Sequence, residues 1–149
     1  MEINFHLNWV KPGPLSRKTF KSEAASSLFL EYVERISKFS SCHSRGNFQE
    51  HEKKPGTKIW LCGKDSKSLG SEELARKLES LRGTGTKKLQ ILIGGPDGFT
   101  KKQISSFNPD FIWSFGPLTL PHELAAVIAA EQIYRAFTIL QKLPYHSGH

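Results

Sequence analysis

The fold of this protein depends on residues 111–137, which read Phe111-Ile-Trp-Ser-Phe-Gly-Pro-Leu-Thr-Leu-Pro-His-Glu-Leu-Ala-Ala-Val-Ile-Ala-Ala-Glu-Gln-Ile-Tyr-Arg-Ala-Phe137. The pattern predicts a short apolar strand, a Gly-Pro turn, a small hydrophobic loop and then a long helix. Pro121 suits the first turn of that helix, where a missing N–H costs nothing, and Thr119 is placed to cap it. Glu123 follows where the helix dipole favours an anion, and Pro144 ends the pattern.

The predicted helix is apolar on more than one face between Leu124 and Leu140. Its small residues would let another backbone approach closely; they are Ala125, Ala126, Ala129 and Ala130. A helix that is apolar on several sides is buried on several sides. In a chain of 149 residues this pattern indicates a partner subunit.

The rest of the chain alternates strands with helices. Strict apolar–polar alternation over 2–9 predicts a half-buried strand. The other expected elements are a helix over roughly 19–38, a strand over 59–62, a helix capped by Ser71 and stopped by Gly83, a strand over 88–93, a short helix over 100–107 and a strand over 111–115. Residues 39–57, polar and interrupted by Gly and Pro, are expected to have the least order, with a weak strand near 38–43. The alternation predicts an α/β fold with a mostly parallel sheet and right-handed crossovers.

Length and composition indicate one globular domain over residues 1–149. No apolar run reaches the roughly 18 residues that a membrane span needs. A basic segment followed by an apolar one, as in a secretion signal, is not found at the N-terminus, so we expect a cytoplasmic protein.

Two further features bear on ligands and partners. Cys42 and Cys62 match no metal-binding spacing, so no metal is expected; reduced thiols are favoured, and a single disulfide stays open. The net charge of +7 favours a polyanionic partner without choosing between nucleic acid and an acidic surface.

Three loops are expected at one edge of the sheet. Ligands of parallel α/β sheets bind beyond the carboxyl ends of the strands. Loops that begin at Leu61, Gly94 and Phe115 leave such ends, and they lie side by side if their strands are neighbours. This edge is the predicted site.

The loop sequences leave the ligand open. Residues 94–98 permit close approach of a ligand to the backbone, but a plain strand-to-helix turn is equally favoured from the pattern alone. They match neither the dinucleotide nor the triphosphate glycine motif. The apolar loop 115–120 would suit a flat ring, although its composition by itself favours core packing.

Candidate catalytic groups are few. No metalloprotease motif, nucleophile elbow or closely spaced carboxylate pair occurs in the sequence. His122 is as well explained by capping or packing, Glu131 and Arg135 by a surface ion pair, and Tyr145-His146 by a frayed tail. The small number of acid–base groups fits a reaction whose driving force is supplied by a cofactor.

Four motifs nevertheless occur together: Ile91-Leu-Ile-Gly-Gly-Pro-Asp-Gly-Phe99, Leu118-Thr-Leu-Pro-His122, Glu131-Gln-Ile-Tyr-Arg-Ala136 and Pro144-Tyr-His146. In this order they closely resemble the RlmH family, the ribosomal RNA large-subunit pseudouridine N3-methyltransferases of the SPOUT superfamily. The resemblance is strong from about residue 58 onward and weak before it.

The resemblance implies a deep C-terminal trefoil knot, a homodimer, and S-adenosylmethionine (SAM) bound within about 58–146. Matched motif by motif, the family's cofactor contacts fall on Leu61, Gly94, Phe115, Gly116, Pro117, Leu118, Thr119 and Leu120. Backbone groups there would hold the adenine and ribose, while Leu61 and Leu118 would form apolar walls. These are the loops that the sheet topology selects.

The resemblance also implies the reaction and its substrate. The methyl group would move in line from the sulfonium to N3, with the protein supplying orientation. Tyr145 and His146 would position the base or remove its proton, and Arg135 is a further catalytic candidate. The substrate would be large-subunit ribosomal RNA, favoured in the assembled ribosome, and its phosphates would match the basic charge.

The chain departs from the family at two places. Ala126 stands where relatives carry Arg, and Ser147, Gly148 and His149 follow His146 where relatives end in Lys or Arg. Both changes remove a cation from the expected active-site side. They leave two alternatives open: a ribosome-binding protein that methylates poorly, and a SPOUT enzyme with another nucleobase target.

Overall fold

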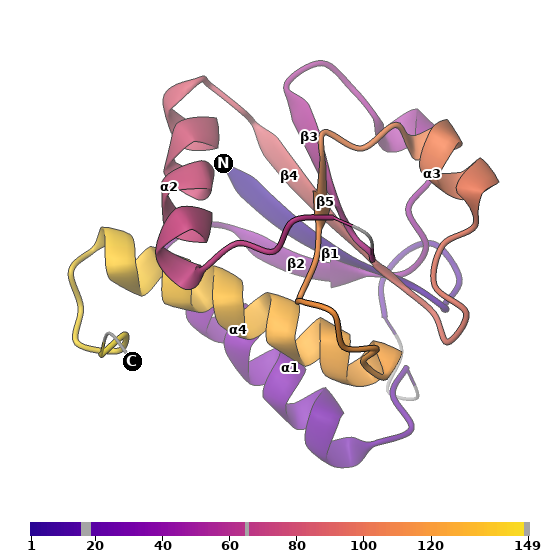
Figure 1. Ribbon diagram of the computed structural model, residues 1–149, viewed down its shortest axis with the longest axis horizontal. Helices are drawn as coiled ribbons and strands as arrows, with labels where there is room; N and C mark the ends of the chain where they lie inside the picture. Colours follow the sequence, from indigo (N-terminus) through magenta and orange to yellow (C-terminus); the bar gives the residue numbers. More distant parts are fainter. Residues whose placement is uncertain (16–18, 65, 148–149) are drawn as a thin grey trace.

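A parallel sheet of five strands lies at the centre of the computed structural model, which describes residues 1–15, 19–64 and 66–147 (Figure 1). The strand order is β2-β1-β4-β3-β5, and every pair is parallel. The strands are β1 (Glu2–Asn8), β2 (Cys42–Arg45), β3 (Thr57–Cys62), β4 (Lys88–Gly94) and β5 (Phe111–Trp113). The predicted α/β class with a mostly parallel sheet is confirmed.

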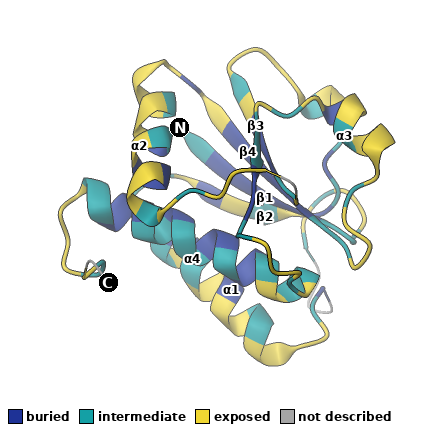
Figure 2. Ribbon diagram, viewed as in Figure 1, coloured by how far each residue is buried: buried dark blue, intermediate teal, exposed yellow. Residues whose placement is uncertain are grey.

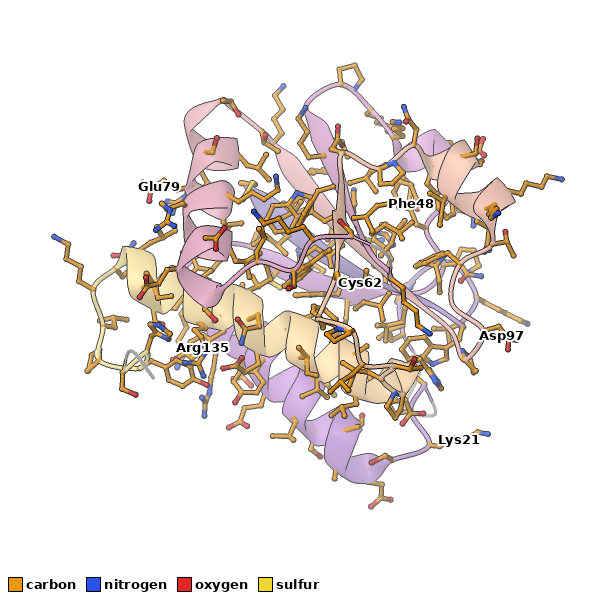
Figure 3. All side chains as sticks on the ribbon, in the orientation of Figure 1. Lys21, Phe48, Cys62, Glu79, Asp97 and Arg135 are labelled. Carbon is orange, nitrogen blue, oxygen red and sulfur yellow. The ribbon has the colours of Figure 1, made fainter. Side chains whose placement is uncertain are left out.

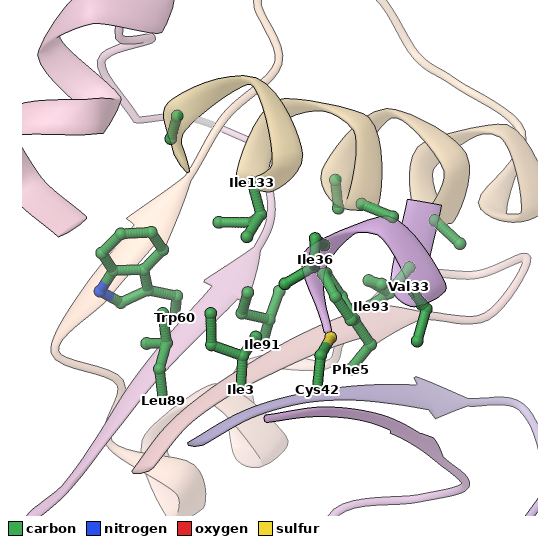
Figure 4. Close-up of a cluster of buried hydrophobic side chains, with 14 of the residues drawn as sticks. Ile3, Phe5, Val33, Ile36, Cys42, Trp60, Leu89, Ile91, Ile93 and Ile133 are labelled. Carbon is green, nitrogen blue, oxygen red and sulfur yellow. The ribbon is translucent and has the colours of Figure 1, made fainter. Parts of the chain in front are cut away.

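Helices cover both faces of the sheet. The elements are α1 (Glu23–Ile36), α2 (Ser71–Gly83), α3 (Lys101–Phe107), α4 (His122–Leu140) and the short 3-10 helix η1 (Glu50–Glu52). One core joins α1, α2 and α4 to alternate residues of the strands, such as Ile91 and Ile93 under Ile36 (Figure 4). A smaller core on the other face joins Leu92 to Phe107 of α3. Alternation along β3 and β4 therefore feeds two separate cores, whereas the buried apolar residues of β1 all belong to the larger one.

The second face of β1 differs from the prediction of a half-buried strand. Asn4 and His6, expected to face solvent, are buried. His6 forms hydrogen bonds with the Gln90 side chain (2.6 Å) and with the backbone carbonyl of Gly46 (3.2 Å), and burial lowers its pKa. The segment after β2 covers this face of β1, where Phe48 packs edge-to-face on His6 with ring centroids 5.1 Å apart, so the His6 ring finds its polar partners inside the protein.

Most of the apolar surface of helix α4 is buried against elements of its own chain. It packs against α1 on one side and α2 on the other, with the sheet beneath (Figure 2). Ala126, Ala129 and Ala130 are fully buried in this way. The apolar faces of α4 are therefore not by themselves an indication of a partner subunit, contrary to the argument from the sequence.

The predicted caps are wrong at two helices. Pro121 itself is the N-cap of α4, and no side chain caps it; the Thr119 hydroxyl instead accepts a hydrogen bond from Lys64 Nζ (3.0 Å). Ser71 is the first residue inside α2, where its hydroxyl donates to Gln132 Oε1 (2.7 Å) and joins α2 to α4. Gly83 ends α2 as predicted.

Residues 39–57 have more structure than expected. They contain β2, displaced from the predicted 38–43, and η1, and Phe48 between these elements is buried in the smaller core. Both cysteines are free thiols. Of the helices in the described ranges, none combines the length and apolarity that crossing a bilayer requires.

Candidate functional site

The three predicted loops converge on one pocket of about 450 Å³. Their strands, β4, β3 and β5, are consecutive neighbours in the sheet, so their carboxyl ends meet at one edge (Figure 1). The first turns of α4 close the pocket through His122 and Ala125. The prediction that these loops lie side by side is confirmed.

Most of the predicted binding residues line this pocket. They are Leu61, Gly94, Phe115, Gly116, Leu118, Thr119 and Leu120. Pro117 belongs to the same loop and is exposed, but it is not part of the lining. Apolar side chains therefore occur on two sides, from Leu61 on the strand and from Leu118 and Leu120 on the loop.

Charged groups stand around the apolar walls. Lys64 and Lys101 contribute cations, and Asp97 contributes a carboxylate from the glycine loop. Lys64 also ties the first loop to the third through its hydrogen bond to Thr119. The pocket thus offers apolar surface, both signs of charge and glycine backbone without side chains to one ligand.

Glycine is required at two positions of the pocket for different reasons. A Cβ at Gly94 would lie 3.0 Å from Gly98 Cα and 3.2 Å from a ring carbon of Phe99, so the loop folds back too closely for a side chain. Gly116 has φ +100°, which L side chains rarely adopt, and its N–H donates to Ser114 Oγ (3.2 Å). Both loops therefore present backbone to the pocket.

Among the lining residues that were not predicted to bind, His122 and Cys62 carry titratable side chains. His122 packs edge-to-face on Trp9, with ring centroids 4.6 Å apart, while it lines the pocket. The Cys62 thiol also lines it, and burial raises its pKa, so the thiol stays protonated. The sequence signal for both is their position: one ends a strand and the other begins a helix at the same edge.

Glu123, next to His122, anchors α4 to α1. Its carboxylate accepts hydrogen bonds from the backbone N–H groups of Lys21 (2.9 Å) and Ser22 (3.0 Å) just before α1. Burial opposes ionisation, but these two donors outweigh it and lower the Glu123 pKa. Glu123 thus occupies the first turn of α4 as predicted, and it also stabilises a second helix N-terminus.

The three catalytic candidates form a separate cluster at the other end of α4. Arg135 forms an ion pair with Glu131 (2.6 Å), and its guanidinium lies 4.8 Å from the ring centre of Tyr145. Neither Arg135 nor Tyr145 nor His146 lines the pocket. Figure 3 shows Arg135 and the pocket residue Asp97 on opposite sides of the chain. The structure brings the candidates together, but away from the predicted cofactor site.

We call Glu131, Arg135, Tyr145 and His146 the tail cluster. Their hydrogen bonds determine which atoms carry protons. Arg135 Nη1 lies 3.1 Å from His146 Nδ1, and because a guanidinium can only donate, Nδ1 must accept. The ring hydrogen of a neutral His146 is therefore on Nε2. Tyr145 donates its hydroxyl hydrogen to Glu131 (3.1 Å), and burial raises its pKa further.

The positions that the resemblance marked as departures also have defined surroundings. Ala126 is fully buried and is absent from the pocket lining, where its neighbour Ala125 is found. Ser147 is exposed, and Gly148 and His149 lie outside the residues that the structure describes. The Ala126 side chain therefore packs in the core of its own chain.

The comparisons with known proteins agree with this geometry. A family model described as predicted SPOUT methyltransferase matches residues 15–146. The ribosomal RNA large subunit methyltransferase H of Koribacter versatilis is 36% identical over 137 residues, which cover 87% of this chain and 92% of that protein.

Other relatives match over shorter segments. The protein of the same name from Xylella fastidiosa strain 9a5c is 51% identical over 82 residues, or 55% of this chain, which spans about half (50%) of that relative. A crystal structure of a hypothetical protein, 13% identical, superposes with a TM-score of 0.52 over 94% of this chain and 88% of that one. This last likeness concerns the fold alone.

Proposed function

The chain belongs to the SPOUT methyltransferase family, and from that premise we propose that it methylates N3 of a pseudouridine in large-subunit ribosomal RNA, using SAM. The observation that carries the proposal is the pocket of about 450 Å³ in which the three loops meet. Curated relatives bear the name ribosomal RNA large subunit methyltransferase H, and the alignment with one of them covers 92% of that relative's length.

The residues of the pocket fit SAM. Its adenine would lie between the apolar side chains of Leu61 and Leu118, against the backbone at Gly94 and Gly116. The cations of the lining suit its carboxylate, and Asp97 suits its ribose hydroxyls or its ammonium group. When bound, SAM supplies a methyl group already activated by a sulfonium charge. The chain must then hold the reactants in line, which is worth roughly 7–11 kcal/mol of the barrier.

We also infer that the C-terminal segment is threaded into a trefoil knot. The segment that joins β3 to α2 crosses the end of β5 (Figure 1). The two segments are joined by a bridge between Ser68 and Ser114 and by a hydrogen bond from the Gly63 N–H to the Trp113 carbonyl (3.0 Å). This crossing supports a threaded path for the chain that continues into α4.

A homodimer would complete the site. The tail cluster lies away from the pocket of its own chain, so it could act on the reacting base only at the pocket of another subunit. Leu118 at the pocket is 72% exposed and Leu124 in the first turn of α4 is 44% exposed, which leaves apolar surface for a partner there. We therefore propose that each active site combines one subunit's pocket with the other's tail.

In this site His146 would position the base. The neutral ring has its Nδ1 acceptor occupied by Arg135, so Nε2–H, which lies 3.7 Å from the exposed Glu72 carboxylate, is the donor that would turn to the substrate. A pyrimidine carbonyl beside N3 is a suitable acceptor. Tyr145, kept protonated by burial and by Glu131, can donate or pack but does not serve as a base near neutral pH, so the proton released from N3 would pass to solvent water.

Ribosomal RNA would supply the polyanion that the net charge of +7 requires. The enzyme would then be cytoplasmic, and the assembled ribosome is the favoured form of the substrate, because a chain this small has little surface for RNA and would borrow recognition from ribosomal shape.

Two measurements test the proposal. Calorimetry should show binding of SAM to the purified protein, and mass spectrometry of ribosomal RNA from a deletion strain should show a large-subunit pseudouridine lacking its N3 methyl group, restored by the gene on a plasmid. Loss of a methyl group from another nucleobase would assign another target. Failure to bind SAM would contradict methyl transfer and favour a ribosome-binding role.

A further inference from the structure

A second hollow, of about 580 Å³, lies beside the cofactor pocket at the same edge of the sheet. Its lining is mostly polar and comprises Asn8, Asn47, Phe48, Gln49, Glu50, His51, Lys102, Gln103, Ser106 and Phe107. The volume is within the roughly 300–1,000 Å³ range of ligand pockets. None of the sequence motifs discussed above accounts for it.

Helix α3 is the wall between the two cavities. Lys101 and Ile104 line the cofactor pocket, whereas Lys102 and Ser106 line the second hollow. On the sheet side, the glycine loop packs directly on the end of β1, where a Cβ at Gly95 would lie 3.3 Å from Trp9 Cβ. A strand of nucleic acid with one nucleotide at the cofactor pocket would cross only the width of one helix, about 10–12 Å, to reach the hollow.

The amide oxygens in the hollow are turned to the protein. Asn8 Oδ1 accepts from the N–H of Phe48 (3.2 Å), and Gln103 Oε1 accepts from the N–H of Thr100 (2.9 Å). Asn47 Oδ1 is buried without a partner among residues 1–15, 19–64 and 66–147. The amide groups that Asn8 and Gln103 have left for a ligand are therefore their NH₂ donors.

The remaining polar side chains add charge and further donors. Lys102 and His51 are exposed, and Ser106 carries a hydroxyl on the same face of α3 as Lys102. Glu50 is the carboxylate of the lining, and it lies on the η1 side, across from α3. A site rich in donors with a lysine beside it suits an anion with many acceptor oxygens.

Phe48 and Phe107 close the bottom of the hollow. Their rings pack edge-to-face with centroids 5.6 Å apart, and both side chains are buried. An apolar floor under polar walls matches a ribose flanked by phosphates better than a free inorganic anion, which offers nothing for the rings to contact.

We propose that this hollow binds the ribose and phosphate of an RNA nucleotide that flanks the target nucleotide. The proposal rests on the proposed function, because it assumes that the target base lies at the cofactor pocket. Lysine, serine and amide side chains are common partners of RNA phosphates, and such contacts position an enzyme without reading sequence. The hollow would thus hold the strand while the neighbouring pocket performs the transfer.

A pair of adjacent substitutions on α3 tests the site. Ser105 and Ser106 are both exposed, but only Ser106 lines the hollow. Ser106→Asp should weaken binding of single-stranded oligouridylate about tenfold because it places a carboxylate among the phosphate donors, whereas Ser105→Asp, with the same charge, should have little effect. Equal losses for the two variants would overturn the proposal.

A second pair measures the phosphate contact directly. Lys102→Gln should lower the slope of log K against log salt concentration by about 1, and Lys38→Gln, an exposed lysine remote from both cavities, should leave the slope unchanged. Melting curves identify any variant that fails to fold. The same slope in both lysine variants would overturn the site.

Calorimetry with SAM separates this proposal from the proposed function. The four variants should bind SAM as the wild type does, since none of the substituted residues lines the cofactor pocket. If the wild type fails to bind SAM, methyl transfer is contradicted while the RNA measurements still decide the hollow. If SAM binds and the paired variants do not differ, the hollow is contradicted and methyl transfer is not.

Discussion

The orientation and tautomer of the His146 ring are constrained by the Arg135 guanidinium, which can donate hydrogen bonds but cannot accept them. Arg135 donates to Nδ1 at 3.1 Å and is itself held by Glu131, whose carboxylate also accepts from Tyr145. The hydrogen bonds of the cluster therefore determine which atom of each group carries a proton. The result is a ring that offers an N–H, which is a means of orienting a carbonyl and not a means of removing a proton.

Two substitutions at His146 distinguish these roles. His146→Gln keeps an N–H donor on a side chain of similar reach, so kcat should remain within about tenfold of wild type, whereas His146→Ala should lose about 10²-fold or more. Methyl transfer to purified ribosomes, followed by single-turnover kinetics across the pH range, measures both.

The pH profile is the control for a merely structural effect. If His146 only positions the base, His146→Gln should keep the shape of the wild-type profile. An equal and large loss in both variants, with the acidic limb of the profile removed, would instead identify His146 as the proton acceptor.

Among the elements, α4 connects the functional regions of the chain. Its first turn lines the pocket through His122 and holds the start of α1 through Glu123. Its middle packs its alanines between α1 and α2, and its last turns carry the tail cluster. Because a helix is rigid along its length, the pocket and the tail are held at a fixed separation.

The loop after β4 gives the prediction at this scale. Gly94→Ala should weaken SAM binding at least about tenfold, since its Cβ would meet the backbone of Gly98 at 3.0 Å and displace the loop. Gly83→Ala is the matched control, because a Cβ there meets nothing within 4 Å. Calorimetry with both variants decides the matter, and wild-type affinity in Gly94→Ala would remove this loop from the cofactor site.

At the scale of the whole molecule, the pocket and the catalytic candidates lie apart. Each chain has a pocket at one end of α4 and a tail cluster at the other, and Figure 3 shows Asp97 of the first and Arg135 of the second far apart. A two-fold dimer brings together the same patch of both subunits, so it could set each tail at the other's pocket and form two equivalent sites.

Mixing two inactive variants tests this arrangement. At a SAM concentration far below the dissociation constant of the Gly94→Ala variant, subunits with that change have an almost empty pocket, and those with His146→Ala lack a working tail. If the site is shared, mixed dimers contain one intact site, and an equal mixture should recover about a quarter of wild-type activity after subunit exchange.

Each variant alone, treated in the same way, is the control. Light scattering should show twice the mass of one chain for all samples. A mixture that remains as inactive as its parts would place the whole site within one chain.

The sequence alone determined the local features of this protein. The apolar pattern placed β1, β3, β4, β5 and the long helix α4, because burial leaves a regular pattern in the chain, whereas β2 was expected a few residues too early. The order of these elements also selected the edge of the sheet at which the three loops meet in a pocket, since parallel strands must bring their carboxyl ends together.

Only the tertiary structure decided what each surface contacts. Asn4 and His6 alternate like solvent-facing residues yet are buried, and the alanines of α4 contact helices of their own chain. The separation of the tail cluster from the pocket, and the second hollow behind α3, were likewise not visible in the sequence. Periodicity records that a side chain is covered, but what covers it depends on packing between segments distant in the chain.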